Sequence, residues 1–447
     1  MTATDNPPTN GNSYSTVGPV TTSERIAMVD VLRGVAVLGI LVINIEFFAL
    51  PSAMLFSPDI VGGFTGMNLL VWKFGHLLFF EKMMAIFSML FGAGLILMFK
   101  RAEAAQKKLG GTYYRRMLWL VVFGLAHAYL LWYGDILFTY AVCGLLLYLF
   151  RRRSARVLMI LGISVLVVGM GIQSGVGVLN SSLRESAMAY QAARDEGEML
   201  TPQQESIIAT WTMVESMFKP TQEGVQKEIA VYQGGFAGIF KSRGFMSLMM
   251  QTQALLIMVF WRAMGLMLLG MAFMKLSIFS GGRSLRFYVG CIVLGYGIGL
   301  PVVWYGMSSM QAHDFDIVYR FMYGNHFNYV GSVLVALAHV SVVVIIVKFG
   351  VLSRLTSRLA AVGRMALSNY LMHSIICTTV FYGYGFGLFG EVERLGLLGI
   401  VIAIWVLQLI VSPIWLAYFR FGPFEWLWRS LTYWRLQPMR LASGENR

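Results

Sequence analysis

The sequence predicts an all-α membrane protein, a polytopic helical bundle with about ten transmembrane helices. Of its 447 residues, 57% are hydrophobic and only 13% are charged, whereas soluble domains are about a quarter charged. The mean hydropathy is +0.66. The apolar residues also collect in runs close to the ~20 residues that a helix needs to cross the hydrocarbon core of a bilayer. These three observations together exclude an ordinary soluble enzyme.

The apolar runs give the expected crossings in order. The segment 64–80 is left out of them because Lys73 and His76 interrupt it, and we expect it to lie at the interface or to re-enter the membrane. Counting it as a crossing would place the first basic cluster on the opposite side from the others. The predicted spans are 29–50, 82–99, 117–133, 135–151, 156–178, 254–275, 285–307, 328–348, 365–385 and 396–419.

Lysine and arginine collect at the ends of these runs, so the net charge of +13 reflects the positive-inside rule. No nucleic-acid partner is expected. Two spans separate each basic cluster from the next, so all clusters and the N-terminus fall on one side. We expect that side to be the cytoplasm, with both termini there. The clusters are 100–116, 151–156, 275–286, 348–364 and 420–440.

Five segments follow from this pattern. The insert on the outer side is expected to be helical, because Thr201 with Gln204 forms a capping-box pattern and Thr221 follows a proline as a second cap. The predicted segments are a disordered cytoplasmic tail (1–24), a first membrane bundle (25–178), an outer helical insert (179–250), a second membrane bundle (251–420) and a cytoplasmic C-terminal tail (421–447).

The first span, VDVLRGVAVLGILVIN, carries three polar residues within an apolar helix. Asp30 lies three residues before Arg33, so the two side chains can pair. Asn44 lies eleven residues after Arg33, which places both on nearly the same helix face about 16 Å apart. An interfacial ion pair and an interhelical hydrogen bond would explain these residues structurally. Their alignment favours a substrate-binding role for Asp30 and Arg33 and a catalytic role for Asn44.

Arg262 lies in the middle of the sixth span, ALLIMVFWRAMGLMLLG. An arginine at that depth costs at least ~2.5 kcal/mol on insertion scales, so it faces a partner or a wet cavity. A structural ion pair and a site for an anionic substrate group are the two interpretations. Glu81, at the start of the second span, and Asp135, in the turn between the third and fourth spans, are the candidate carboxylates.

Histidines complete the candidate site. His76 and His127 lie near Glu81 and Asp135 in the outer half of the predicted bundle. A histidine beside a carboxylate is typical of a general base, and Asn44 or Arg262 would stabilise an oxyanion. We therefore expect these groups to share one water-accessible chamber, although each histidine could instead be a core residue. No standard metal-ligand spacing occurs, so no metal site is predicted. Two further candidates for substrate binding, four residues apart on one helix face, are Asn369 and His373.

Four stretches together resemble the YeiB family of bacterial membrane proteins, which carries a domain of unknown function, number 418. The resemblance runs from residue 25 to about residue 434 and implies a location in a bacterial inner membrane. The stretches are RIAMVDVLRGVAVLGILVIN, EKMMAIFSMLFGAG, HAYLLWYGDILFTYAVCGLLL, and GRMALSNYLMHSIICTTVFYGYGFGLFG with FRFGPFEWLWRSLTYW after it.

That family is grouped with a superfamily of transmembrane acyltransferases, which implies a transmembrane-acyltransferase-like fold. By that likeness Arg33 matches the arginine that opens the first-helix motif of the superfamily. Asn44 stands where many of these enzymes have a histidine, and His76 is the nearest counterpart of a second histidine, at a different spacing. The implied activity moves an acyl group from a cytoplasmic thioester donor to a periplasmic or lipid acceptor.

The resemblance implies no tightly bound cofactor, with acyl-CoA as a donor substrate. The alternative interpretation is a transporter or lipid-binding protein that holds an anionic headgroup or solute with Arg262. A membrane scaffold whose insert binds a partner is a third. Expected partners are membrane lipids and a small-molecule or lipid substrate, and the glycine- and aromatic-rich spans favour a homodimer.

Overall fold

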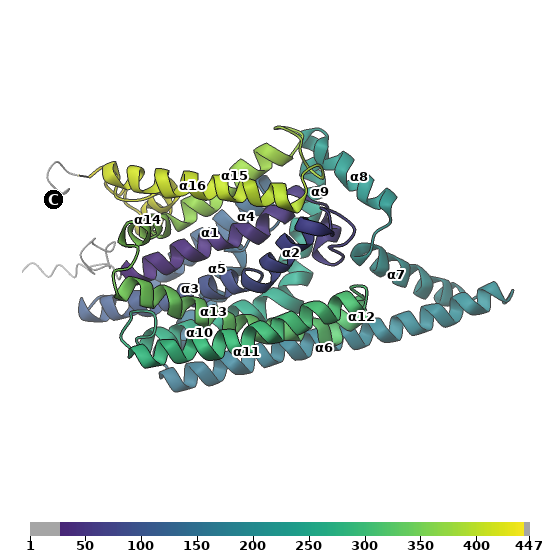
Figure 1. Cartoon of the computed structure of the whole chain (residues 1–447), viewed down its shortest axis with the longest axis horizontal. Coiled ribbons are helices and arrows are strands. Elements are labelled where there is room, and N and C mark those ends of the chain that lie inside the picture. The colour runs from purple at the N-terminus through teal and green to yellow at the C-terminus, as the bar shows by residue number, and fades with distance from the viewer. Residues whose placement is uncertain (1–26, 442–447) are drawn as a thin grey trace, which may run out of the picture.

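The computed structural model describes residues 27–441, so the predicted tail at 1–24 lies outside the described residues (Figure 1). Within 27–441 the chain is helical and holds no β-strand, only one isolated bridge between Phe419 and Arg440. The helices before the insert are α1 (Ala27–Ala49), η2 (Ser52–Leu55), α2 (Gly66–Leu78), α3 (Lys82–Ala104), α4 (Gly110–Leu130), α5 (Leu137–Leu147), η3 (Tyr148–Phe150) and α6 (Ala155–Asp195).

The remaining helices form the insert and the second half of the bundle. The insert and its return are α7 (Pro202–Phe218), α8 (Gln222–Gln233), α9 (Phe236–Met249), η4 (Met250–Val259) and α10 (Phe260–Lys275). They are followed by α11 (Leu285–Ala312), α12 (Ile317–Tyr319), η5 (Arg320–Gly324), α13 (Asn325–Lys348), α14 (Ser353–Arg364), α15 (Ala366–Phe381), α16 (Arg394–Tyr418) and α17 (Pro423–Tyr433).

The prediction of an all-α membrane bundle is confirmed. In the described part of the chain, seven helical stretches are long and apolar enough to cross a membrane. Three predicted spans correspond to α4, α5 and α15, which are not among the seven; α5 has only 11 residues. The seven stretches are Ala27–Ala49, Gly66–Ala104, Ala155–Asp195, Phe236–Lys275, Leu285–Ala312, Ile317–Lys348 and Arg394–Tyr418. The number of about ten crossings stays a prediction. The segment predicted to lie at the interface forms α2, which adjoins α3 within the second stretch, Gly66–Ala104.

The basic loops gather at one end of the bundle, which we call the basic end. The α3–α4, η3–α6, α10–α11 and α13–α14 connections all lie there, beside the C-terminal segment (Figure 1). The insert projects from the opposite end, the insert end. The sequence pattern that placed every basic cluster on one side of the bundle therefore matches the fold.

Glycines let helices from the two halves of the chain touch backbone to backbone. A Cβ at Gly92 of α3 would lie 2.0 Å from the carbonyl oxygen of Met267 on α10, and one at Gly270 would lie 1.9 Å from that of Met89. α1 meets α14 in the same way at Gly34. Small residues at such crossings are typical of membrane helices. The two predicted bundles thus form one interlocked bundle, and these glycines serve contacts within the chain.

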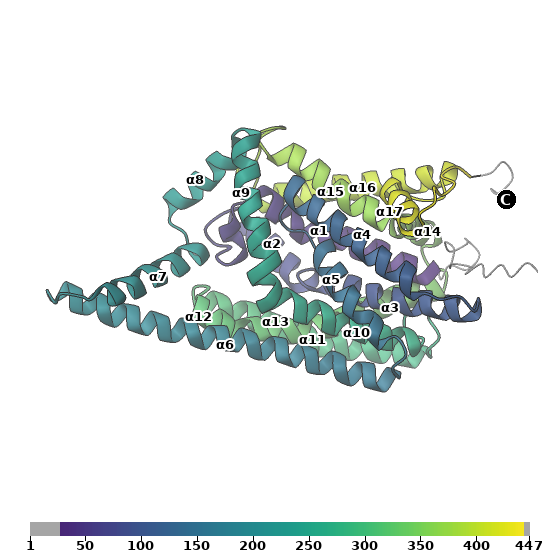
Figure 2. The same cartoon turned by 180° about the vertical axis from the view of Figure 1, so that it is seen from behind.

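The insert grows out of one long helix. α6 has 41 residues and runs without a break from the predicted fifth span into the insert (Figure 2). The capping box of Thr201 with Gln204 is confirmed at the start of α7, as is the Thr221 cap of α8. Glu228 of α8 accepts hydrogen bonds from the backbone N and the Oγ of Ser52, each 3.0 Å long. The chain then re-enters the bundle through α9, η4 and α10.

Candidate functional site

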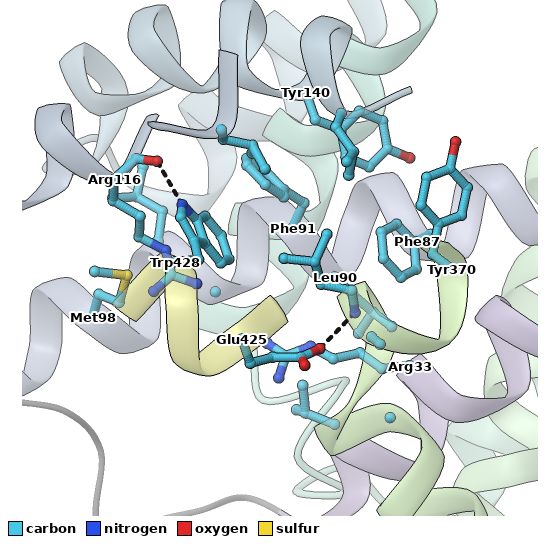
Figure 3. Close-up of a pocket in the computed structure, with 18 of the residues that line it drawn as sticks. Arg33, Phe87, Leu90, Phe91, Met98, Arg116, Tyr140, Tyr370, Glu425 and Trp428 are labelled. Carbon is cyan, nitrogen blue, oxygen red and sulfur yellow. Dashed lines mark hydrogen bonds between the residues drawn. The ribbon is translucent and has the colours of Figure 1, made fainter. Parts of the chain in front are cut away.

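A cavity of about 250 Å³ opens among helices α1, α3, α4, α5, α14, α15 and α17 toward the basic end (Figure 3). Most of its lining is apolar and aromatic, including Phe87, Leu90, Phe91 and Trp428. Arginines from five different helices also line it, and we call them the cavity arginines. They are Arg33, Arg101, Arg116, Arg364 and Arg429.

The positive charge of this cavity exceeds its negative charge. Against the five cavity arginines, its lining holds only two carboxylates, Asp30 and Glu425. Asp30 Oδ1 lies 3.1 Å from Arg33 Nη1, which confirms the pairing expected three residues apart on α1. The Arg33 side chain keeps 32% of its surface exposed. The cavity is therefore a site of positive potential bordered by an apolar chamber.

The wall at the basic end is built by the amphipathic helix α17. Glu425 accepts hydrogen bonds from the backbone N of Leu367 at 2.7 Å and of Ser368 at 3.1 Å, which ties α17 to the start of α15. Trp428 donates its indole N–H to the carbonyl oxygen of Arg116 at 2.9 Å, and the Arg116 guanidinium stacks 3.7 Å above the indole ring. These contacts hold the guanidinium in place along the wall (Figure 3).

The inner end of the cavity is lined by Tyr140 and Tyr370, across from Arg33 and Glu425 (Figure 3). Behind Tyr370 lie two of the predicted catalytic residues. His127 and Asp135 are paired, with 2.7 Å between Nδ1 and Oδ1. The prediction placed Asp135 in an outer turn, and the structure buries that turn beneath α9.

One arginine on α9 holds this buried turn in place through hydrogen bonds. Arg243 is fully buried and donates hydrogen bonds to the carbonyl oxygens of Tyr129 and Leu131 at 3.0 and 3.1 Å. Ser247 donates to the carbonyl oxygen of Ala128 at 2.9 Å. The last carbonyls of a helix have no partner within it, so α9 supplies the partners that the C-terminus of α4 needs inside the bundle.

Arg262 and Glu81 form a separate, closed group. Arg262 Nη2 lies 3.1 Å from Glu81 Oε2 and 2.6 Å from Ser332 Oγ. Asn328 donates to Glu81 at 2.9 Å and accepts from the fully buried Lys82 at 2.7 Å. We call Glu81, Lys82, Arg262 and Asn328 the closed cluster. Every charge in it has a partner, so the structure supports the ion-pair interpretation of Arg262.

The carbonyl oxygen of His76 accepts a hydrogen bond from Lys82 of the closed cluster at 2.7 Å, but the His76 imidazole lies in a different place. It lines a second cavity of about 70 Å³ near the insert end, together with Glu46 and Arg320. Its ring stacks on Phe80 with 4.9 Å between centroids. Asn44 is half-buried on α1 and lines neither of the two cavities.

The expectation of a single shared chamber is therefore wrong. Helix depth alone suggested it, but interhelical contacts divide the predicted residues into the His127–Asp135 pair, the closed cluster and the cavity that His76 lines.

Asn369 and His373 share one face of α15, as predicted, and that face packs on α16. Asn369 donates to Ser412 Oγ at 3.1 Å, and His373 Nε2 lies 2.9 Å from Oε1 of Gln408. Gln408 in turn donates to the carbonyl oxygen of Asn369 at 3.0 Å. All these side chains are buried. The geometry gives Asn369 and His373 a role in joining two helices, and neither lines the two cavities described above.

Sequence reasoning missed several functional candidates. In the sequence, four of the cavity arginines belong only to the basic clusters that indicate orientation: Arg101, Arg116, Arg364 and Arg429. Ser374 was passed over beside His373, although it lies four residues after Tyr370 and hence on the same helix face. That spacing was the one signal in the sequence that could have linked Ser374 to the cavity.

Comparison with known proteins identifies the family. The chain is 32% identical to the uncharacterised protein YeiB of Escherichia coli (strain K12) over 427 residues, which cover 92% of this chain and 96% of YeiB. It is 30% identical to the uncharacterised protein YxaH of Bacillus subtilis (strain 168), with 95% and 98% covered. The chain belongs to the YeiB family. The model for the protein of unknown function DUF418 matches residues 273–435.

The matched residues include α14, α15 and α17, each of which lines part of the main cavity. A further relative, an uncharacterised 39.9 kDa protein of Bacillus acidopullulyticus, is 24% identical, with 95% of this chain and 98% of its own length covered. No solved structure matches this chain.

Proposed function

We propose that this YeiB-family protein transfers an acyl group from a cytoplasmic thioester donor to a hydroxyl or amine on a periplasmic or lipid acceptor. The basic end would face the cytoplasm of a bacterial inner membrane, by the positive-inside rule. The cavity arginines would hold the phosphates of an acyl-CoA, and the apolar chamber beyond them would hold the acyl end. The protein would act as a membrane-embedded enzyme that takes its donor from the water phase.

The observation that carries this proposal is the cavity itself. Five arginines line it against two carboxylates, and apolar and aromatic side chains make up most of the rest. Guanidinium groups bind phosphate oxygens through paired, charge-assisted hydrogen bonds. A phosphorylated carrier with an apolar acyl group has the same division between an anionic and an apolar part.

The experiment measures binding and turnover of acetyl-CoA by the full chain in lipid nanodiscs. We expect binding, slow release of free thiol, and faster release when an acceptor is present. Arg33→Gln should weaken binding about tenfold or more, because a hydrogen bond to a charged group contributes about 1.5–3 kcal/mol. Arg156→Gln is the matched control, because Arg156 is exposed at the same end and does not line the cavity.

The same measurement decides the alternative of a lipid-binding or transport protein. Because Arg262 is already paired with Glu81, an anionic headgroup would instead be expected at the cavity arginines. A co-purifying anionic lipid that is lost in Arg33→Gln, with neither binding nor turnover of acetyl-CoA, would replace the acyltransferase proposal with this one.

A further inference from the structure

A hydroxyl, an imidazole and a carboxylate meet behind the inner end of the main cavity. Ser374 Oγ lies 2.7 Å from Nε2 of His127, whose Nδ1 lies 2.7 Å from Oδ1 of Asp135. All three side chains are buried. They come from α15, from α4 and from the turn before α5, so three separate segments converge on this point.

The two oxygens of Asp135 have separate partners. Asp135 Oδ2 accepts a hydrogen bond from the backbone N of Phe138 at 2.7 Å, which holds the carboxylate against the start of α5. In the tautomer with its proton on Nδ1, His127 donates to Oδ1, and Nε2 accepts the proton of the Ser374 hydroxyl. A nucleophile, a base and a group that orients the base stand in this order in serine hydrolases and acyltransferases.

The cavity reaches the neighbours of this triad. Ile136, which follows Asp135, lines it, and so does Tyr370, one turn before Ser374. The Tyr370 ring lies 5.2 Å from the imidazole of His127, between centroids, and forms the wall between cavity and triad. Its hydroxyl is 3.5 Å from the carbonyl oxygen of Gly134, at the weak limit of a hydrogen bond. The same hydroxyl also has a hydrogen bond to the backbone of Ile136. A donor in the cavity would reach the triad only after this ring turns aside.

A buried donor without a partner lies beside the triad. The indole N–H of Trp132 has no hydrogen-bond partner in the described part of the chain, and Trp132 is 2% exposed. Its ring centroid lies 6.2 Å from that of His127. An unsatisfied buried donor costs about 1–3 kcal/mol. Trp132 is therefore a candidate donor to a carbonyl oxygen bound beside His127.

We propose that Ser374 is a catalytic nucleophile that carries the acyl group as an ester between donor and acceptor. This inference rests on the proposed function for the identity of the donor, an acyl thioester. Ser374 Oγ bonds to the thioester carbonyl carbon, and the carbon–sulfur bond breaks. His127 takes the hydroxyl proton and gives it to the leaving sulfur, which departs as a thiol.

In the second half of the reaction, the acyl group passes from Ser374 to the acceptor. Its hydroxyl or amine bonds to the ester carbon as the bond to Ser374 Oγ breaks. His127 takes the acceptor proton and returns it to Ser374. No oxidant or reductant is needed, and the triad ends in its starting state.

The first test is independent of the donor. The full chain in nanodiscs is treated with an alkyl fluorophosphonate, which forms a phosphorus–oxygen bond with an activated serine as its phosphorus–fluorine bond breaks. Peptide mass spectrometry should find one phosphonyl group, on Ser374. His127→Gln should slow the reaction about 100-fold or more, the usual contribution of a general base. Ser341→Ala is the matched control, because Ser341 is also buried but donates to the carbonyl oxygen of Leu337.

Three outcomes would overturn the proposal. They are a folded wild-type protein that takes up no label at saturating reagent, a label on another residue, and equal labelling of Ser374→Ala. If Ser374→Ala fails to fold, the rate in His127→Gln decides by the same criterion.

The second test separates this proposal from the proposed function. Acyl-CoA labelled in its acyl group is mixed with the protein and quenched in acid, and the label should remain as an ester on Ser374. Acyl transfer that continues in Ser374→Ala would refute the covalent step and leave the acyltransferase proposal standing. Labelling of Ser374 by fluorophosphonate without turnover of any acyl-CoA would refute the thioester donor and leave the activated serine in place.

Discussion

Two regions of this bundle bring charged side chains into apolar surroundings, with opposite results. In the closed cluster, Arg262 and Lys82 meet Glu81 and Asn328 at 2.7–3.1 Å, and each charge is partnered. In the main cavity, the cavity arginines outnumber the carboxylates and border empty space of about 250 Å³. The first region pairs its charges within the cluster, whereas the lining of the second holds more arginines than carboxylates.

This difference teaches that depth in the membrane does not by itself identify a functional charge. Arg262 was the most conspicuous residue of the sequence, because an arginine in mid-span is expensive. Its cost is offset by partners on α13 and at the start of α3. Arg33, near the end of the first span and predicted to bind substrate, is the one of these two arginines that lines the cavity. The four predictions that follow break or sharpen this contrast.

The largest effect is expected from opening the closed cluster. Arg262→Ala leaves Glu81 without its main counter-charge, and removing one partner of a buried pair costs about 3–5 kcal/mol. We expect a clear fall in unfolding temperature, measured by tryptophan fluorescence in detergent. The double variant Arg262→Leu with Glu81→Gln should recover part of the loss. An unchanged unfolding temperature in Arg262→Ala would show that the cluster does not stabilise the fold.

Salt should weaken ligand binding in the main cavity and should not weaken the ion pair of the closed cluster. The Arg33 side chain is 32% exposed and that of Arg262 only 3%, and ions screen exposed charges far more than buried ones. We expect acetyl-CoA binding to weaken several-fold as salt rises from about 0.1 to about 1 M, over which the Debye length falls from about 10 to about 3 Å. Calorimetry measures the binding, and the unfolding temperature serves as the control. An affinity for acetyl-CoA that does not change with salt would contradict a phosphate-binding site.

A smaller effect is expected from the α15–α16 contact. His373→Leu removes the hydrogen bond to Gln408, and such bonds between membrane helices contribute about 0.6 kcal/mol on average. The unfolding temperature should fall slightly while acetyl-CoA binding keeps its affinity. Loss of binding without loss of stability would restore His373 as a substrate-binding residue.

The smallest effect concerns pH. Burial raises the pKa of the Glu425 carboxyl on α17 above its ordinary value of 4.5. The folded state therefore holds this proton more tightly than the unfolded state does. The resulting stability is complete below pH 4.5 and is lost as pH rises through the raised pKa.

Glu425→Gln removes this titration and keeps an acceptor for the backbone N–H groups of Leu367 and Ser368. We expect the stability of the wild type to fall, relative to that of Glu425→Gln, as pH rises above 4.5. Unfolding temperatures measured across pH for both proteins check this. Parallel profiles would refute it.

Local patterns in the sequence predicted local structure well. Asp30 pairs with Arg33, Thr201 caps α7 in a capping box, and the basic loops lie at one end. Each of these follows from the helical period, from backbone groups left open at a helix end, or from the distribution of lysine and arginine. The sequence also supplied His127 and Asp135, because they lie eight residues apart across one short turn.

What the sequence could not predict depends on how helices cross. Ser374 lies 247 positions from His127, and the two meet only because α15 packs beside α4. The cavity arginines come from helices that span nearly the whole chain. The assumption that residues at equal depth share a chamber failed because each helix also has a rotation about its axis, which neighbouring helices set.

By itself, the sequence determined that this is a membrane protein, that it is helical, that its basic loops gather at one end, and which contacts form within a turn or two of helix. Apolar length, charge at helix ends and the 3.6-residue period are properties of a single segment. The tertiary structure alone decided which charges are matched and which face a cavity, because backbone contacts at Gly34, Gly92 and Gly270 set how the helices cross. Pairing between distant helices is a property of that packing, and no single segment encodes it.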